Sequence, residues 1–283
     1  MNVFIINDRL AIVAGRDGYF LVNRNDVYIG RALQIYGENC GAEGALLKAL
    51  IKPGDHVIEV GSNIGSLTIG LAKAVGPSGR VYAFEPQPVC YSTLHAQIAL
   101  NQLSNIVAYP QAVGYERGRL WLPRVDYDAL GNFGGVALSQ NQTAGSIAVD
   151  VVTLDERCAE VPCALLKIDV EGMEEHVIRG ATKLIQRSQP IIYTENDRFE
   201  KSKSLVLTLL ELGYRLWWHI VRIYSPDNFF KNQENVFGNV ACYNMVCAPQ
   251  AHAMFSGLVE IKSADDPHPL APKPTFTGWE NTG

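Results

Sequence analysis

The spacing of hydrophobic and polar positions changes character along the chain. Near the N-terminus, short β-branched and aromatic runs are separated by Asn, Asp and Gly, which is typical of a small antiparallel meander. We expect its strands at residues 3–6, 10–13, 19–22 and 27–29. An apolar helical pattern follows at 42–50 and ends at the turn Lys52-Pro-Gly-Asp55. We therefore assign residues 1–50 to a β meander and a cap helix.

From residue 51 onward, buried-type strands alternate with helical segments. This rhythm predicts βαβ units and a mostly parallel sheet with helices on both faces. We expect strands at 56–60, 80–84, 106–110, 164–168 and 191–194, with two last strands near 214–220 and 241–247. We expect helices at 65–75, up to about residue 101, at 172–186 and at 203–212. The chain is thus predicted to have an α/β fold that binds ligands where its strands end.

Two segments depart from this rhythm. Residues 115–155 are rich in Gly, Asn and Asp and alternate at 120–122 and 148–152, which indicates a β-rich insert. Residues 263–283 contain four prolines and predict an exposed, flexible tail. We therefore place a main domain at 51–250, which contains the insert, and a C-terminal extension at 251–283.

Composition narrows the classes of protein that fit this pattern. Of the 283 residues, 47% are hydrophobic and 19% are charged, which excludes a mostly disordered chain. The formal net charge is −5 and the basic residues are scattered, so we expect no nucleic-acid partner. No apolar run approaches the roughly 18 residues of a membrane span, and the start has no basic leader. We expect a cytoplasmic protein whose six cysteines are reduced and mostly buried.

The turn after the first long strand carries an acid and two glycines, in Glu59-Val-Gly-Ser-Asn-Ile-Gly-Ser66. Gly61 and Gly65 permit a tight turn and a close approach of the backbone to a ligand. A dinucleotide fingerprint would also need glycines where Asn63 and Ser66 stand. A carboxylate at Glu59 would repel a pyrophosphate but pair with a cationic amino-acid group. The motif therefore favours S-adenosylmethionine over NAD, with a purely structural loop as the alternative.

A second acid ends the next strand, in Phe84-Glu85-Pro86. Glu85 follows Gly61 at a spacing close to the roughly 20 residues at which an acid binds ribose hydroxyls. Pro86 stops the strand and fixes the turn. Because acids stand at two successive strand ends, a purely structural loop is the weaker interpretation.

Further carboxylates follow the next two strands. Asp169 and Glu171 emerge at the end of one strand, and Glu195 ends its neighbour. One of them can act as a general base toward a substrate hydroxyl, or several can bind a divalent cation, although we assign no metal ligand. The structural alternative is that Asp169 caps the next helix and Glu195 forms an ion pair.

The order of these motifs resembles the FkbM family of S-adenosylmethionine-dependent methyltransferases. The resemblance runs from about residue 30 to 247. Its motifs are Tyr36–Glu38, Lys52–Asp55, Glu59–Gly65, Val81–Pro86, Thr153–Asp155, Leu166–Gly172, Gly180-Ala181 and Glu195. It implies a Rossmann-like class I methyltransferase fold, S-adenosyl-L-methionine as cofactor, and O-methylation of a hydroxyl on a sugar or natural product. One departure is Glu59, where Asp is commoner.

The resemblance also implies roles for individual residues. It implies cofactor contacts from Glu59, Gly61, Asn63, Gly65 and Glu85, to which we add Ser62, Ser66, Pro86 and Ala112. The candidate catalytic residues are Asp169, Glu171 and Glu195. We expect the insert to select the acceptor and name Trp121, Asn132 and Asn196 as candidate substrate contacts.

Other functions remain compatible with the sequence. An N-methyltransferase or a peptide-directed methyltransferase would differ only in its acceptor. A nicotinamide-dependent oxidoreductase would need the glycine that is absent at position 63. A non-catalytic binding protein would have no need of acids at the two expected cofactor positions, Glu59 and Glu85. Both acids are present, which argues against this alternative. We expect a small hydroxylated molecule as the partner, and the sequence leaves open whether the chain forms a homo-oligomer.

Overall fold

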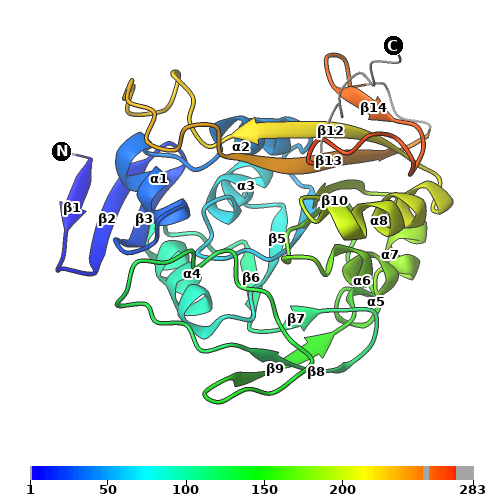
Figure 1. Ribbon diagram of the computed structural model, residues 1–283, viewed down its shortest axis with the longest axis horizontal. Coiled ribbons are helices and arrows are strands. Elements are labelled where there is room, and N and C mark those ends of the chain that lie inside the picture. Colours follow the sequence, from blue (N-terminus) through cyan, green and yellow to red (C-terminus); the bar gives the residue numbers. More distant parts are fainter. Residues whose placement is uncertain (1, 251–254, 272–283) are drawn as a thin grey trace, which may run out of the picture.

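The computed structural model describes residues 2–250 and 255–271, whose strands form three sheets (Figure 1). The largest sheet has the strand order β14-β12-β13-β11-β10-β4-β5-β6. Its parallel strands are β4 (His56–Val60), β5 (Arg80–Phe84), β6 (Ile106–Tyr109), β10 (Cys163–Ile168) and β11 (Ile191–Glu195). Its antiparallel strands are β12 (Tyr214–Arg222), β13 (Ala241–Pro249) and β14 (Val259–Ile261). The predicted α/β class with a mostly parallel central sheet is confirmed.

Helices cover both faces of this sheet because successive residues of a buried strand point to opposite sides. Ile58 and Leu166 belong to one hydrophobic core, and Val57 and Leu165 belong to another. The first core includes residues of α5 (Leu154–Arg157), α6 (Glu174–Arg179), α7 (Thr182–Ser188) and α8 (Phe199–Glu211). The second includes residues of α2 (Gly41–Ala49) and α3 (Thr68–Val75). The sheet and these two layers form the predicted Rossmann-like fold.

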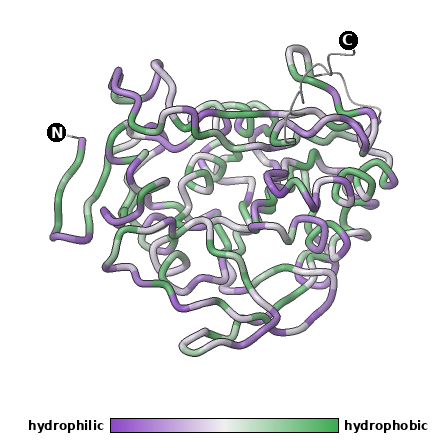
Figure 2. Tube along the Cα trace, viewed as in Figure 1, coloured by the Kyte–Doolittle hydropathy of each residue, from purple (hydrophilic) through white to green (hydrophobic). Residues whose placement is uncertain are grey.

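A small N-terminal sheet lies at one end of the molecule (Figure 1). It consists of the antiparallel strands β1 (Val3–Ile5), β2 (Leu10–Gly15) and β3 (Gly18–Asn23), which confirms three predicted strands. Figure 2 shows β1 as hydrophobic and the turn that follows it as hydrophilic. The sheet contacts α4 (Pro88–Leu100) through the side-chain amide of Gln97. This amide accepts a hydrogen bond from the backbone N–H of Leu21 at 2.8 Å and donates one to the Leu21 oxygen at 2.9 Å.

The fourth predicted strand, at 27–29, is wrong. Ile29 begins the helix α1 (Ile29–Tyr36) instead. The carboxylate of Asp26 accepts the backbone N–H groups of Tyr28 and Gly30, at 3.0 and 2.9 Å. These donors lie where a helix begins and lack partners within it, so a side-chain acceptor stabilises the helical start. This local capping outweighs the β preference of Val27 and Ile29.

The single helix predicted at 172–186 is also wrong, because the chain forms α6 and α7 with a break at Gly180. A Cβ atom at Gly180 would lie 1.9 Å from the backbone oxygen of Gly114, so the chain passes there too closely for any larger residue. The carboxylate of Asp155 then accepts the backbone N–H groups of Lys183 and Leu184, at 3.1 and 2.8 Å. This side chain therefore starts α7 as a separate helix.

A third sheet has the strand order β7-β9-β8, and two of its strands come from the predicted insert. Its strands are β7 (Ala112–Val113), β8 (Gly118–Leu122) and β9 (Ile147–Val152), and the two stretches of predicted alternation fall in β8 and β9. The segment between β8 and β9 contacts the residues that precede α1 and α4. The Val27 N–H donates to the Gly131 oxygen at 3.0 Å, and the Gln87 side chain donates to the Phe133 oxygen at 2.9 Å.

The last described segment joins the main sheet, because β14 pairs with β12. Most of the tail that we predict to be flexible, residues 272–283, lies outside the described residues. In the described parts of the chain, none of the helices combines the length and the hydrophobicity that a membrane crossing demands.

Candidate functional site

Two adjoining cavities lie beside the carboxyl ends of β4, β5 and β10, the edge at which parallel α/β sheets bind ligands. The larger cavity has a volume of about 440 Å³ and also reaches the end of β11. The residues that line both cavities mark the place where they meet: Gly61, Asn63, Glu85, Gly134, Asp169 and Glu171.

The loop after β4 passes close to the chain that leaves β10. Gly61 has a φ of 83°, and a Cβ atom on it would lie 1.7 Å from the backbone oxygen of Asp169. The N–H groups of Gly61 and Ser62 both donate to the Phe84 oxygen, at 2.9 and 3.1 Å. Glycine is therefore required at position 61, where the loop is held between two strand ends and turns into the cavities.

Glu85, at the end of β5, is almost fully buried. Its two carboxylate oxygens accept the backbone N–H groups of Asn63 and Gln87, both at 2.8 Å. Burial raises the pKa of Glu85 to about 7, against the lowering effect of these hydrogen bonds. Because Glu85 lines both cavities, its carboxylate can accept hydrogen bonds from a ligand that spans them.

Glu59 is 1% exposed and lies on β4, where the Thr68 hydroxyl donates to its carboxylate at 2.5 Å. Burial raises its pKa to about 7, although the nearby charge of Lys167 acts in the opposite direction. Glu59 lines the larger cavity, as does Glu85. The two acids that the sequence singles out therefore share one cavity.

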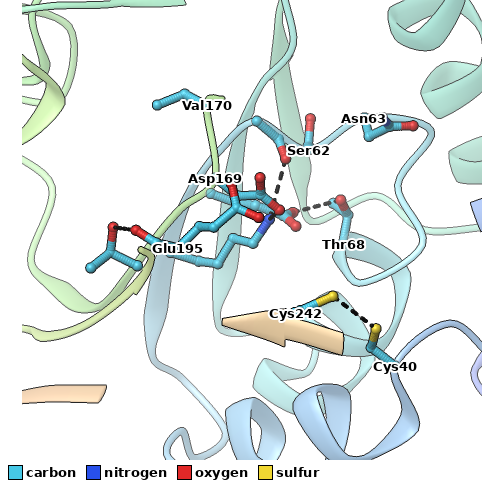
Figure 3. Close-up of polar contacts among 12 residues, drawn as sticks. Cys40, Ser62, Asn63, Thr68, Asp169, Val170, Glu195 and Cys242 are labelled. Carbon is cyan, nitrogen blue, oxygen red and sulfur yellow. Dashed lines mark hydrogen bonds and ion pairs between the residues drawn. The ribbon is translucent and has the colours of Figure 1, made fainter. Parts of the chain in front are cut away.

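Lys167 is a buried cation in the middle of this acidic region. It is 3% exposed, and its Nζ donates to Asp169 at 3.1 Å and to the Gly61 oxygen at 3.3 Å. Burial acts to lower the pKa of Lys167, but the carboxylates of Asp169, Glu59 and Glu43 together raise it above the ordinary value. Figure 3 shows Asp169 beside the loop that carries Ser62. Lys167 therefore holds Asp169 in place with an opposite charge.

One carboxylate oxygen from each of Asp169, Glu171 and Glu195 lies within 4.8 Å of the other two. Arg198 forms an ion pair with Glu171. The Oε2 atom of Glu195 is buried and has no hydrogen-bond partner among the described residues. Burial, followed by the negative charge of Asp169, raises the pKa of Glu195 well above that of an ordinary glutamate. Glu195 can therefore exchange a proton with a molecule in the larger cavity.

The described residues do not show the structural roles that were the alternatives for Asp169 and Glu195, a helix cap and an ion pair. Glu174, rather than Asp169, accepts the N–H groups of Val170 and Gly172 before α6, at 3.2 and 2.9 Å. Within the described residues Glu195 forms no ion pair with a Lys or Arg side chain.

The smaller cavity has a mostly apolar lining. Its apolar residues are Val60, Phe84, Pro86, Ala112, Val113, Leu122, Val136, Leu138, Val170 and Met173. Gln111 also lines it, and the Oε1 atom of this side chain is buried without a partner in the described chain. The cavity therefore combines apolar walls with an unused hydrogen-bond acceptor, which suits a flat ring that carries an N–H group.

The structure places most of the predicted site residues around the two cavities. Those that line only the larger one are Glu59, Ser62, Ser66, Glu195 and Asn132, and those that line only the smaller one are Pro86 and Ala112. Gly65, Trp121 and Asn196 line neither. Asn196 is 3% exposed and donates to Ser202 at 2.9 Å, and Trp121 pairs with Ser139 in a β-bridge. Trp121 and Asn196 therefore stay predictions that the lining of the two cavities does not support.

Several residues that line the cavities are not among those predicted from the sequence. These are Glu43, Gln87, Gln111, Lys167 and Arg198. Lys167 had a detectable signal, because it is a charged residue inside the apolar run of β10. Glu43 had no such signal in the sequence, because it lies in α2 and the pattern of that segment predicts only a helix.

Comparison with known proteins places these motifs in a family. A family model described as the Methyltransferase FkbM domain matches residues 59–216. Methyltransferase 1 of Beauveria bassiana (strain ARSEF 2860) is 30% identical over 143 residues, which cover 44% of this chain and 57% of that protein. The 31-O-demethyl-FK506 methyltransferase FkbM of Streptomyces tacrolimicus is 32% identical over 158 residues, covering 46% and 60%. The matches thus span less than two thirds of each relative.

Solved structures give weaker similarities. The crystal structure of Methyltransferase FkbM from Methylobacillus flagellatus KT has a TM-score of 0.45 and 19% identity, covering 68% of this chain and 43% of that one. A SAM-dependent O-methyltransferase from Thermotoga maritima has a TM-score of 0.48 and 14% identity, covering 86% and 79%. The family model, in contrast, matches more than half of the 283 residues. This chain belongs to the FkbM methyltransferase family.

Proposed function

We propose that this protein binds S-adenosyl-L-methionine and transfers its methyl group to a hydroxyl of a small molecule. The observation that carries the proposal is the meeting of an apolar and an acidic cavity at Glu85. The apolar cavity, with the unused acceptor of Gln111, suits an adenine ring and its amino group. Glu85 then faces the ribose hydroxyls, and Glu59 faces the methionine end.

The charge of the larger cavity supports a cationic ligand. Seven carboxylates line it, against the two cations Lys167 and Arg198. The carboxylates are Glu43, Glu59, Glu85, Asp169, Glu171, Glu195 and Asp197. S-adenosyl-L-methionine carries a sulfonium and an ammonium group, so this excess of negative charge favours it. The same charge would repel the pyrophosphate of a nicotinamide dinucleotide.

The acids at the ends of β10 and β11 have separate parts in this proposal. When bound, S-adenosyl-L-methionine supplies a methyl group that its sulfonium already activates. The acceptor hydroxyl must then be oriented and lose its proton. We assign proton removal to Glu195, which lines the larger cavity and whose pKa is raised by burial. We assign orientation of the hydroxyl to Asp169, which the contact with Lys167 holds in place.

Calorimetric titration with S-adenosyl-L-methionine and with NADH tests the cofactor. We expect the first to bind at one site per chain at pH 8 and the second to give no heat of binding. Transfer of a labelled methyl group to a panel of hydroxylated sugars and natural products then tests the acceptor. Binding of NADH alone would contradict the proposal.

N-methylation is the second candidate, and the same excess of carboxylates favours it. An amine acceptor is a cation before it loses its proton, so an acidic cavity attracts it. A product mass spectrum with paired hydroxyl and amine acceptors of the same skeleton separates the two reactions.

A further inference from the structure

Three side chains outside the proposed reaction centre lie together, and two of them line the larger cavity. Cys40 immediately precedes α2, Glu43 lies in the first turn of α2, and Cys242 lies near the start of β13. The two Sγ atoms are 3.3 Å apart, and Figure 3 shows them facing each other. One donor atom from each of the three residues lies within 4.8 Å of the others. Segments distant in sequence thus bring two thiols and a carboxylate together.

The burial of these groups favours a cation in contact with them. Cys40 is 1% exposed and Glu43 is 5% exposed. The positive charge that acts on the Glu43 carboxylate is Lys167, which already donates its hydrogen bonds to Asp169 and to Gly61. A buried carboxylate is costly when it lacks a directly bound partner. A positive charge in contact with Glu43 would offset this cost.

We propose that Cys40, Glu43 and Cys242 bind a divalent cation of the zinc class. Zinc accepts thiolate sulfur at about 2.3 Å and carboxylate oxygen at about 2.0–2.2 Å in tetrahedral sites. Two sulfurs on one such ion lie roughly 3.8 Å apart by that geometry. The observed 3.3 Å between the Sγ atoms therefore has to widen by only a few tenths of an ångström. Both thiols release their protons to solvent as the ion binds.

The carboxylate is what distinguishes this site from a disulfide. A disulfide needs the two sulfurs alone and would leave Glu43 buried without a contacting cation. A zinc-class ion uses all three donors. Glu43 and Cys242 also line the cavity, so the fourth position of the ion would face it and hold water or an acceptor oxygen.

The acids of the reaction centre are the weaker metal site. Asp169 already pairs with Lys167, and Glu171 already pairs with Arg198. These two cations compete directly with a metal ion for the same oxygens. The cluster of Cys40, Glu43 and Cys242 has no such competitor in contact among the described residues.

Titration of the reduced, metal-free full chain with Co²⁺ tests this site without cofactor or acceptor. We expect one equivalent of Co²⁺ to give the near-ultraviolet charge-transfer band of cobalt bound to thiolate, together with the strong visible absorption of a tetrahedral site. Zn²⁺ should displace the cobalt and remove both signals. C242S and E43Q should each weaken Co²⁺ binding at least tenfold.

C90S is the matched control, because Cys90 is a buried cysteine of α4 outside this cluster, and it should leave both signals unchanged. Thermal denaturation of each variant shows that a lost signal does not come from unfolding. A reduced wild-type protein with six titratable thiols and no charge-transfer band would overturn the proposal, as would an equal loss of signal in C90S. The methyltransferase proposal is unaffected by that result, because the titration measures neither cofactor binding nor turnover.

Discussion

Glu85 shows how one buried side chain links the sequence to a ligand. The acid is recognisable in the sequence because it ends a strand before Pro86. Its environment is visible only in the structure, where two backbone N–H groups hold both oxygens and burial raises its pKa to about 7. The carboxylate is thus fixed in one orientation before any ligand arrives, which lowers the entropic cost of binding.

We expect Glu85→Ala to weaken binding of S-adenosyl-L-methionine by about 2 kcal/mol, roughly 30-fold, because a charged hydrogen-bond acceptor is lost. Calorimetry at pH 8 measures the change. Asp150→Ala, at an exposed position of β9, serves as the control and should leave affinity unchanged. An unaltered affinity in Glu85→Ala would remove Glu85 from the cofactor site.

Asp169 has a different role in the proposal, so its substitution should have a different signature. We expect Asp169→Asn to cut turnover while affinity for S-adenosyl-L-methionine stays within a few-fold, because the contact with Lys167 loses its charge and the acceptor is no longer held. Turnover and calorimetric affinity are measured on the same preparation. Unchanged turnover would assign Asp169 a structural role only.

At the scale of elements, the loop after β4 joins the ends of three strands. Gly61 bonds to Phe84 at the end of β5, and its α-carbon faces the chain leaving β10. The geometry of the cavities thus depends on how closely these segments approach. Adding one methyl group at Gly61 therefore tests whether the fold needs this close contact with the chain that leaves β10.

We expect Gly61→Ala to lower the free energy of unfolding by about 3 kcal/mol or more, because the new methyl group would overlap the Asp169 oxygen. Gly213→Ala is the matched control, since Gly213 also has a positive φ, of 81°, but its Cβ would meet no atom within 4 Å. That variant should lose only about 1–2 kcal/mol from backbone strain. Urea denaturation compares them, and equal losses would show that the close approach does not matter.

At the scale of the whole molecule, the fold concentrates negative charge in one interior region. Burial raises the pKa values of Glu43, Glu59 and Glu85 to about 7, from 4.5 for an unperturbed glutamate. Between those pH values the folded state binds more protons than the unfolded state. The free energy of unfolding should therefore fall as the pH rises from about 4.5 to about 7.

We expect the ligand-free protein to be more stable at pH 5.5 than at pH 8, and saturating S-adenosyl-L-methionine to restore part of the loss at pH 8. Urea denaturation across this range measures both effects. Glu59→Gln should flatten the pH dependence, because it removes one of the groups that take up a proton on folding. A stability that rises steadily from pH 5.5 to pH 8 would contradict the expected sign.

The two wrong elements have different causes, one a local side-chain cap and the other a contact with a distant segment. Residues 27–29 have β-type side chains, yet Asp26 supplies the hydrogen bonds that start a helix. The hydrophobic period of 172–186 continues through Gly180, yet the break there depends on the backbone of Gly114, from a different part of the chain. The spacing of hydrophobic residues indicates which face of a helix or strand is buried. It does not indicate which atoms from other parts of the fold approach that face.

The sequence by itself determined the alternation of strands and helices in the main domain, the mostly parallel sheet, and the acids and glycines at its carboxyl edge. These features follow from the local spacing of hydrophobic residues and from the rule that the carboxyl ends of parallel strands meet at one edge of a sheet. Only the tertiary structure decided that Lys167 lies among the acids, that Glu195 has an oxygen without a partner in the described part of the chain, and that Cys40 meets Cys242. Such contacts join segments far apart in the chain, so their energies depend on distance and burial in three dimensions, which no local pattern encodes.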